Sequence, residues 1–259
     1  MERAQAVGLS AVALTDHDTL AGVLAAGAAG QRLGVRVVAG CEFSVRAPWG
    51  ELHLLAYFLP TDDSALNAYL AQARSARERR GAQMVEKLQR LGVEIDLEDL
   101  AVQAGTGAVG RPHVARALVD AGAVDDFEQA FDRYLGRGRP AFVAKPLPAL
   151  RDVTELVHRV GGLAVAAHLG DRGHEALLRD FKADGLDGVE IRHPSHPKHV
   201  EARLAKLARE LDLVVSGGSD WHGEADPALA HAPLGGMKVP MEWLDGLETR
   251  RAKTYGGTA

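Results

Sequence analysis

The chain has 259 residues, of which 46% are hydrophobic, enough to form a large buried core and to exclude a disordered protein. Its formal net charge of -5 argues against a protein that coats nucleic acid or an acidic membrane with its whole surface. Cys41 is the single cysteine, so it has no disulfide partner within the chain, and neither a signal peptide nor a long apolar span is visible. We therefore expect a cytoplasmic protein that does not enter a membrane. Nothing in the pattern indicates an oligomeric state.

The first 61 residues alternate between apolar runs and helical patterns. The expected elements, in chain order, are a helix at residues 2–7, a strand at 11–15, a helix at 20–33, and strands at 35–39, 41–46 and 52–58. The last two strands flank a Pro/Gly turn signal at residues 47–50. This order is typical of a βαβ arrangement followed by two further strands.

The next part of the chain has helical patterns only, at residues 65–91, 97–104, 111–121 and 127–135. We interpret residues 62–138 as a helical subdomain inserted into a barrel domain formed by residues 1–61 and 139–259. The alternation then resumes, with helices at 150–160, 175–183 and 199–211 and strands at 163–167, 188–191 and 213–216. Parallel strands covered by helices form an α/β barrel or an open doubly wound sheet, and neither periodicity nor length distinguishes the two.

Histidines and carboxylates recur where the apolar strands end. They are Asp16, His17 and Asp18 after the strand at 11–15, Glu42 after 35–39, His53 at the start of the next strand, His168 after 163–167, Glu190 within 188–191, and Asp220 and His222 after 213–216. In α/β barrels, residues from the C-terminal ends of different strands converge on one face. We therefore expect these side chains to share one pocket.

This set of side chains favours metal chemistry. Imidazole nitrogens and carboxylate oxygens bind zinc, iron and manganese, and a carboxylate can bridge two ions. Taken singly, His17, His53 or His168 could equally well satisfy buried backbone, but their shared position at strand ends weakens that interpretation. Cys41 precedes Glu42 on an expected strand, so its side chain faces the opposite side and belongs to the core. The sequence contains no serine elbow and no phosphate-binding P-loop.

Several short motifs resemble those of the PHP (polymerase and histidinol phosphatase) family. They are TDHDT at residues 15–19, GCEFS at 40–44, HLL at 53–55, AH at 167–168 and SDWHG at 219–223. GRPH at 110–113, FDRYLGRG at 131–138 and the segment 190–196 resemble the branch of 3′,5′-nucleoside bisphosphate phosphatases and 5′ to 3′ exoribonucleases. The motifs span nearly the whole chain, and their order and combination are more specific than any one of them.

The resemblance implies a distorted seven-stranded β/α (TIM-like) barrel that holds up to three divalent ions, Mn, Zn or Fe. The implied metal ligands are His17, Glu42, His53, His168, Asp220 and His222, and the implied substrate-binding residues are Arg111, Arg137 and His196. Glu42 would bridge ions, with His53 and His168 completing the ligands of one ion. Asp220 would bind a second ion, and His17 and His222 a third.

The chain departs from the family pattern at its start. The family opens with a strand that carries a His-x-His pair, followed by an Asp in a Ser-Asp-Gly turn, whereas Met1 of this chain falls in the helix that should come after them. We therefore expect an N-terminally truncated barrel whose second and third ions keep two protein ligands each. Such a chain is expected to hold fewer than three ions and to hydrolyse its substrate slowly or not at all.

The function that the resemblance implies is hydrolysis of phosphate monoesters or terminal phosphodiesters, with a metal-bound water as the nucleophile and no protein nucleophile. The expected partner is a phosphorylated small molecule, a nucleotide or a short RNA end. Two other interpretations stay open. An amidohydrolase-type barrel uses similar ligands to attack a carbonyl, and a non-catalytic PHP-like module would explain the missing first motif.

Overall fold

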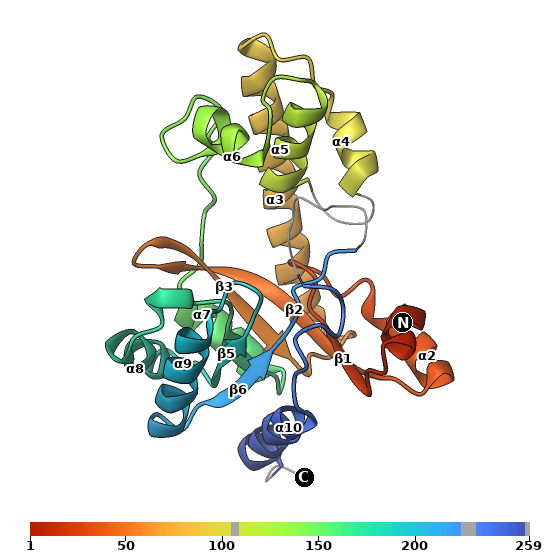
Figure 1. The fold of residues 1–259 in the computed structure, drawn as a ribbon, viewed down its shortest axis with the longest axis vertical. Coiled ribbons are helices and arrows are strands. Elements are labelled where there is room, and N and C mark those ends of the chain that lie inside the picture. The colour runs from red at the N-terminus through yellow and green to blue at the C-terminus, as the bar shows by residue number, and fades with distance from the viewer. Residues whose placement is uncertain (105–108, 224–231, 257–259) are drawn as a thin grey trace. The chain divides into compact units, whose positions relative to one another are not determined.

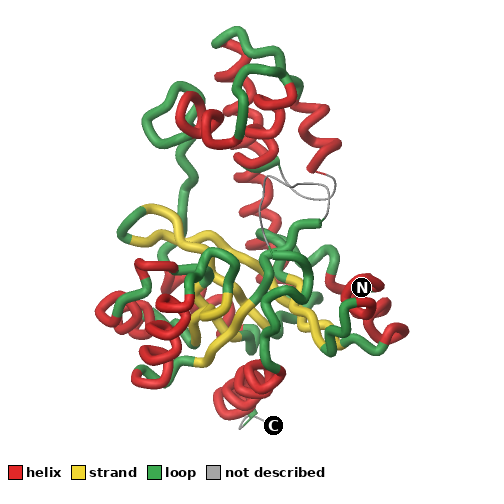
Figure 2. Tube along the Cα trace, viewed as in Figure 1, coloured by secondary structure: helices red, strands yellow, loops and turns green. Residues whose placement is uncertain are grey.

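The computed structural model describes residues 1–104, 109–223 and 232–256, and the chain divides into two compact units. The sheet unit comprises Met1–Asn67 and Leu147–Ala259, and the helical unit comprises Ala68–Pro146. Within the described part of the chain, every strand belongs to the sheet unit (Figure 2). Among the same residues, no helix combines the length and the apolar character needed to cross a membrane.

The sheet unit is built on one curled sheet in the order β1-β2-β3-β4-β5-β6 (Figure 1). Its strands are β1 Ala11–Leu14, β2 Arg36–Ala47, β3 Gly50–Tyr57, β4 Leu163–Ala166, β5 Gly188–Arg192 and β6 Val214–Gly217. β1 is parallel to β2, and β5 is parallel to both β4 and β6, but β3 is antiparallel to both β2 and β4. β3 is therefore the antiparallel member of a sheet whose β1–β2, β4–β5 and β5–β6 pairs are parallel.

The connection between β2 and β3 explains this direction. Ala47 pairs with Gly50, so Pro48 and Trp49 alone join the two strands, and so short a connection can join only antiparallel strands. The two strands expected at 35–39 and 41–46 form the single strand β2. Gly40, between them, makes this continuity possible, because a Cβ there would lie 2.7 Å from the carbonyl oxygen of Ala56 on β3.

Helices cover the sheet. They are α1 Glu2–Ala6, α2 Val23–Leu33, α7 Leu150–Arg159, α8 Glu175–Ala183, α9 Lys198–Glu210 and α10 Met241–Tyr255, with a 3-10 turn η2 at Gly170–Arg172. α2 packs on β2, α7 on β2 and β4, α9 on β5 and β6, and α10 on β6 (Figure 1). α7 buries Leu150, Val153 and Val157 at the three- and four-residue spacing of one helix face. α10 was not predicted, because its apolar residues Trp243, Leu244 and Leu247 occupy only its first half and the turn after Leu247 is polar.

An apolar cluster holds β2, β3, β4 and α10 together. It contains Val38, Leu55, Leu163, Val165 and Leu247, all of which are buried. Burial of each such side chain contributes roughly 1.5–3 kcal/mol, so the strands that carry the candidate site rest on a firm core.

The helical unit contains α4 Leu97–Ala104, α5 Arg111–Asp120, α6 Phe127–Ala130 and a π-helical turn η1 Phe131–Leu135, together with α3 Ser64–Arg90, which begins in the sheet unit. Its core includes Met84, Leu88, Leu100, Leu118 and Leu135. The single helix expected at 127–135 changes into the π-helical turn at Phe131, where the Gly136 N–H donates to the Phe131 carbonyl at 2.7 Å.

Candidate metal centre

Glu42 and His53 project from the same face of the β2–β3 pair. Leu55 lies directly opposite Glu42 in the register, and His53 is two residues from Leu55. Because side chains alternate along a strand, His53 shares a face with Glu42 and lies diagonally across from it. Cys41 points to the other side and is fully buried, and burial raises the pKa of its thiol well above the ordinary value.

His168 reaches the same place from the end of β4. Its backbone adopts a φ of 31°, a left-handed conformation that is unusual for a residue with a side chain. The neighbouring Ala167 N–H donates to the His53 carbonyl at 3.0 Å, and the His168 N–H donates to Glu190 Oε2 at 2.8 Å. These two bonds hold the turn that aims the His168 ring at Glu42.

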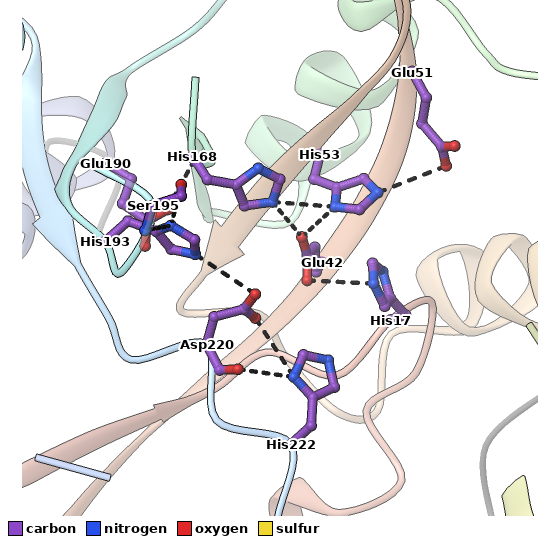
Figure 3. A network of polar contacts seen from close by, with 10 residues as sticks. All are labelled: His17, Glu42, Glu51, His53, His168, Glu190, His193, Ser195, Asp220 and His222. Carbon is purple, nitrogen blue, oxygen red and sulfur yellow. Dashed lines mark hydrogen bonds and ion pairs between the residues drawn. The ribbon is translucent and has the colours of Figure 1, made fainter. Parts of the chain in front are cut away.

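Three donor atoms form a compact triangle (Figure 3). Glu42 Oε1 lies 2.8 Å from His53 Nδ1 and 3.4 Å from His168 Nε2, and the two nitrogens are 3.2 Å apart. Ligands held about 2.0–2.1 Å from a tetrahedral ion are themselves about 3.3–3.4 Å apart. Two edges of the triangle match this spacing and the third is shorter by about half an ångström, so the donor set fits a divalent ion with little movement.

The second oxygen of Glu42 faces a different histidine. Glu42 Oε2 lies 3.6 Å from His17 Nε2, and the donor atoms of His17, Glu42 and His53 all lie within 4.8 Å of one another. His17 is held near Glu42 by a β-bridge between the two residues. A carboxylate with a different histidine at each oxygen has the arrangement expected of a ligand that bridges two ions.

The electrostatics of the cluster are dominated by Glu42. Burial acts to raise the pKa of Glu42, but His17, His168 and His53 hold it well below its ordinary value. Burial lowers the pKa of His53, yet its contacts with Glu42 and Glu51 raise it to about 9. Without a metal ion, the raised pKa of His53 keeps its imidazole protonated beside this buried carboxylate and offsets the charge of Glu42.

Asp220 and His222 approach from the loop after β6. Asp220 has a φ of 50°, and its Oδ1 lies 3.8 Å from His222 Nδ1, which also contacts the Asp220 carbonyl at 2.8 Å. Gly217, the last residue of β6, lets that strand pack closely on β5, since a Cβ there would lie 2.8 Å from the Arg192 carbonyl oxygen.

A row of imidazole rings connects the donors around Glu42 with Asp220 and His222. The ring centroids of His17 and His53 are 4.8 Å apart, those of His53 and His168 are 5.0 Å apart, and those of His168 and His193 are 5.1 Å apart. His193 in turn has its Nε2 3.5 Å from Asp220 Oδ2 (Figure 3). The structure thus brings residues from six separate segments of the sequence into one cluster.

Two residues of this cluster were not predicted from the sequence. His193 directly follows β5, the same strand-end position that pointed to the other residues. Glu51 is two residues before His53 on β3, and its Oε1 lies 3.7 Å from His53 Nε2. Both residues could have been found from the sequence. His193 follows a strand, as the predicted ligands do, and Glu51 is two residues from the predicted ligand His53 on the same strand face.

Glu190, on β5, is buried, and its Oε2 accepts the hydrogen bond from the His168 backbone N–H. Burial raises the pKa of its carboxyl to about 8, although the hydrogen bond from the His168 backbone acts in the opposite direction.

The residues expected to bind phosphate are placed differently. His196 is buried with both ring nitrogens used within the fold: Nδ1 bonds to the Ile191 carbonyl at 2.7 Å, and Nε2 accepts from the Gly170 N–H at 3.0 Å. These contacts give His196 a structural role and do not support phosphate binding. Arg111 begins α5, with its guanidinium 5.9 Å from the centre of the Phe131 ring, and Arg137 is exposed. Both belong to the helical unit, so their contact with a substrate stays a prediction.

The sequence model of the PHP domain matches residues 1–183 of the chain. The chain belongs to the PHP domain family. A 5′-3′ exoribonuclease of Haemophilus influenzae is 34% identical, over 86% of this chain and 82% of its own length. A 3′,5′-nucleoside bisphosphate phosphatase of Chromobacterium violaceum is 35% identical, over 89% of this chain and 84% of its own length.

A crystal structure described as a metal-dependent phosphoesterase from Bifidobacterium adolescentis is similar to this PHP domain protein, with a TM-score of 0.85 and 33% identity. The match covers 96% of this chain and 88% of that one. The family, the relatives and the clustered histidines and carboxylates agree, and the PHP domain protein is a hydrolytic enzyme.

Proposed function

We propose that this PHP domain protein uses Mn, Zn or Fe ions to hydrolyse phosphate monoesters or terminal phosphodiesters of nucleotides or short RNA. The observation that carries the proposal is the triangle of Glu42 Oε1, His53 Nδ1 and His168 Nε2, with edges of 2.8–3.4 Å. Imidazole and carboxylate donors at this spacing suit a catalytic ion that has three protein ligands and an open position.

The assignment of the other ligands rests on the resemblance to the PHP family and on the position of His17 beside Glu42 Oε2. We assign Glu42 and Asp220 to a second ion, and His17 and His222 to a third. Two protein ligands per ion make these positions weaker than the first, so they depend more on substrate oxygens or solvent to fill the coordination sphere.

The chemistry divides between the ions and the chain. Divalent ions held here supply the charge that activates water and neutralises the phosphoryl oxygens. Glu42 orients the donor set, and the left-handed turns at His168 and Asp220 fix two of the donors before substrate arrives. Cys41 is buried on the other face of β2 with a raised pKa, so it supplies no nucleophile.

Nucleotides and RNA ends are the proposed substrates because two similar proteins are a nucleoside bisphosphate phosphatase and an exoribonuclease. We infer that Arg111 and Arg137 contact substrate phosphate from residues 62–138, which we interpret as an insertion. We further infer that residues 1–61 and 139–259 belong to a distorted seven-stranded barrel, of which the described residues contain six strands. A TM-score of 0.85 to a metal-dependent phosphoesterase supports this inference.

The test is a product screen on manganese-loaded protein with four substrates. They are a nucleoside 3′,5′-bisphosphate, a 5′-phosphorylated RNA oligonucleotide, an aryl phosphate and an N-acyl amide. We expect release of phosphate or nucleotide and no amide cleavage. His168→Ala should abolish the reaction, whereas His199→Ala, in which the removed imidazole is 70% exposed on α9, should not. Amide cleavage, or phosphate release that His168→Ala leaves unchanged, would overturn the proposal.

A further inference from the structure

His193 is a buried histidine with no assigned role. It directly follows β5, and its ring lies between those of His168 and His196, with centroid distances of 5.1 Å and 5.5 Å. Its side chain is 8% exposed. A polar ring buried to this degree needs a specific partner at each nitrogen.

The contacts of Nδ1 determine where the ring carries its proton. The Ser195 backbone N–H donates to His193 Nδ1 at 3.1 Å, and Ser195 Oγ lies 2.8 Å from the same nitrogen. A backbone N–H can only donate, so Nδ1 must accept and cannot carry a proton itself. The proton of the neutral imidazole is therefore on Nε2.

The protonated nitrogen points at Asp220. His193 Nε2 lies 3.5 Å from Asp220 Oδ2, and within the described residues it has no hydrogen-bond partner (Figure 3). Asp220 Oδ1 faces the other way, 3.8 Å from His222 Nδ1. The two oxygens of Asp220 thus face different neighbours.

We propose that His193 is a positioning residue: with a divalent ion at Asp220 Oδ1, the His193 Nε2–H closes the 3.5 Å contact and donates a hydrogen bond to Asp220 Oδ2. The inference rests on the proposed function, because it assumes that Asp220 is a metal ligand. A protonated Nε2 has no lone pair to offer, so His193 is not itself a ligand. Hydrogen bonds of this kind orient ligating carboxylates, and their loss typically lowers metal affinity about 10- to 100-fold.

The test compares Mn²⁺ binding by the whole chain and its variants in a chelator-competition titration. His193→Phe keeps a planar ring and removes the donor, and His193→Gln keeps an N–H that reaches in a similar direction. We expect His193→Phe to weaken the class of Mn²⁺ sites that Asp220→Ala removes, about 10- to 100-fold, and His193→Gln to recover most of the affinity. His199→Ala serves as the exposed histidine control.

Two further readouts separate positioning from a merely structural role. The kcat of His193→Phe should return toward the wild-type value when Mn²⁺ is raised, which a folding defect would not allow. In metal-free protein, side-chain ¹⁵N spectra should show the His193 proton on Nε2, and Ser195→Ala should leave it there because the backbone N–H remains.

The outcomes that overturn the inference differ from those that overturn the proposed function. If Asp220→Ala leaves Mn²⁺ binding unchanged, Asp220 is not a ligand, and His193 cannot position it for a metal ion. If Asp220→Ala weakens binding and His193→Phe does not, only the role of His193 is wrong. A proton on Nδ1 would also overturn it.

Discussion

Glu42 on β2 and His53 on β3 lie diagonally across an antiparallel strand pair, with Glu42 Oε1 2.8 Å from His53 Nδ1. Their contact depends on the register of two strands joined by a two-residue turn. A shift of one residue would turn His53 to the opposite face of the sheet. The hairpin is therefore as much a part of the candidate metal centre as the ligands themselves.

The first prediction concerns substrate selectivity. Arg111→Ala should raise KM for a nucleoside 3′,5′-bisphosphate about tenfold or more, because a charged hydrogen bond to phosphate contributes roughly 1.5–3 kcal/mol. KM for a small aryl phosphate should change much less. Steady-state kinetics on both substrates provide the measurement, with Arg90→Ala as a control, since Arg90 is an exposed arginine paired with Glu86 on α3. Equal effects on the two substrates would show that Arg111 is not a selective contact.

The second prediction concerns the sheet. A Cβ at Gly188 would lie 2.5 Å from the Val214 carbonyl oxygen and 2.6 Å from Val214 Cγ2, so Gly188→Ala must push β5 and β6 apart. We expect a loss of about 1–3 kcal/mol in the free energy of unfolding. The control is Gly27→Ala on α2, where nothing lies within 4 Å and the change should be neutral or stabilising. Urea unfolding of the wild type and both variants measures the free energies of unfolding. An unchanged midpoint for Gly188→Ala would contradict close packing of β5 on β6.

The third prediction concerns pH. His158 Nε2 lies 2.8 Å from Asp187 Oδ2, and this hydrogen bond is the main reason that the pKa of His158 is raised above 6.5. The folded protein then holds the proton more tightly than the unfolded chain. The pair stabilises the fold fully below pH 6.5, and this contribution disappears as pH rises through the raised pKa.

His158→Gln should therefore be less stable than the wild type at pH 5.5, and the difference should shrink toward pH 9. Thermal unfolding of both proteins across this range, in the presence of EDTA, measures the difference. A stability difference between the two proteins that does not change with pH would show that the charge of His158 does not stabilise the fold.

The strand-end pattern predicted which side chains lie near one another, because it depends on chain geometry alone. Glu42, His168 and Asp220 each follow an apolar run. In the structure His168 contacts Glu42, and Asp220 lies beside His193. Their roles as ligands stay a prediction, because side-chain placement does not show which ions bind.

Other features could not be predicted, for physical reasons. α10 buries Leu247, but its apolar spacing stops there, because the residues of the next turn, 248–251, are all polar. His193 is recognisable only once β5 is known to end at Arg192. The substrate contacts of Arg111 and Arg137 depend on a bound ligand, which neither the sequence nor the fold supplies.

The metal centre at Glu42 is tested most directly by metal content, measured by elemental analysis alongside phosphate release for the wild type and Glu42→Gln. The Glu42 carboxylate contacts the ring nitrogens of His17, His53 and His168. Its loss should therefore remove the tightly held ion and lower kcat about 100-fold or more. Glu155→Gln on the exposed face of α7 is the matched control and should resemble the wild type. We predict at least one ion per wild-type chain and none in Glu42→Gln. Equal metal content and equal turnover in both would contradict the proposed centre.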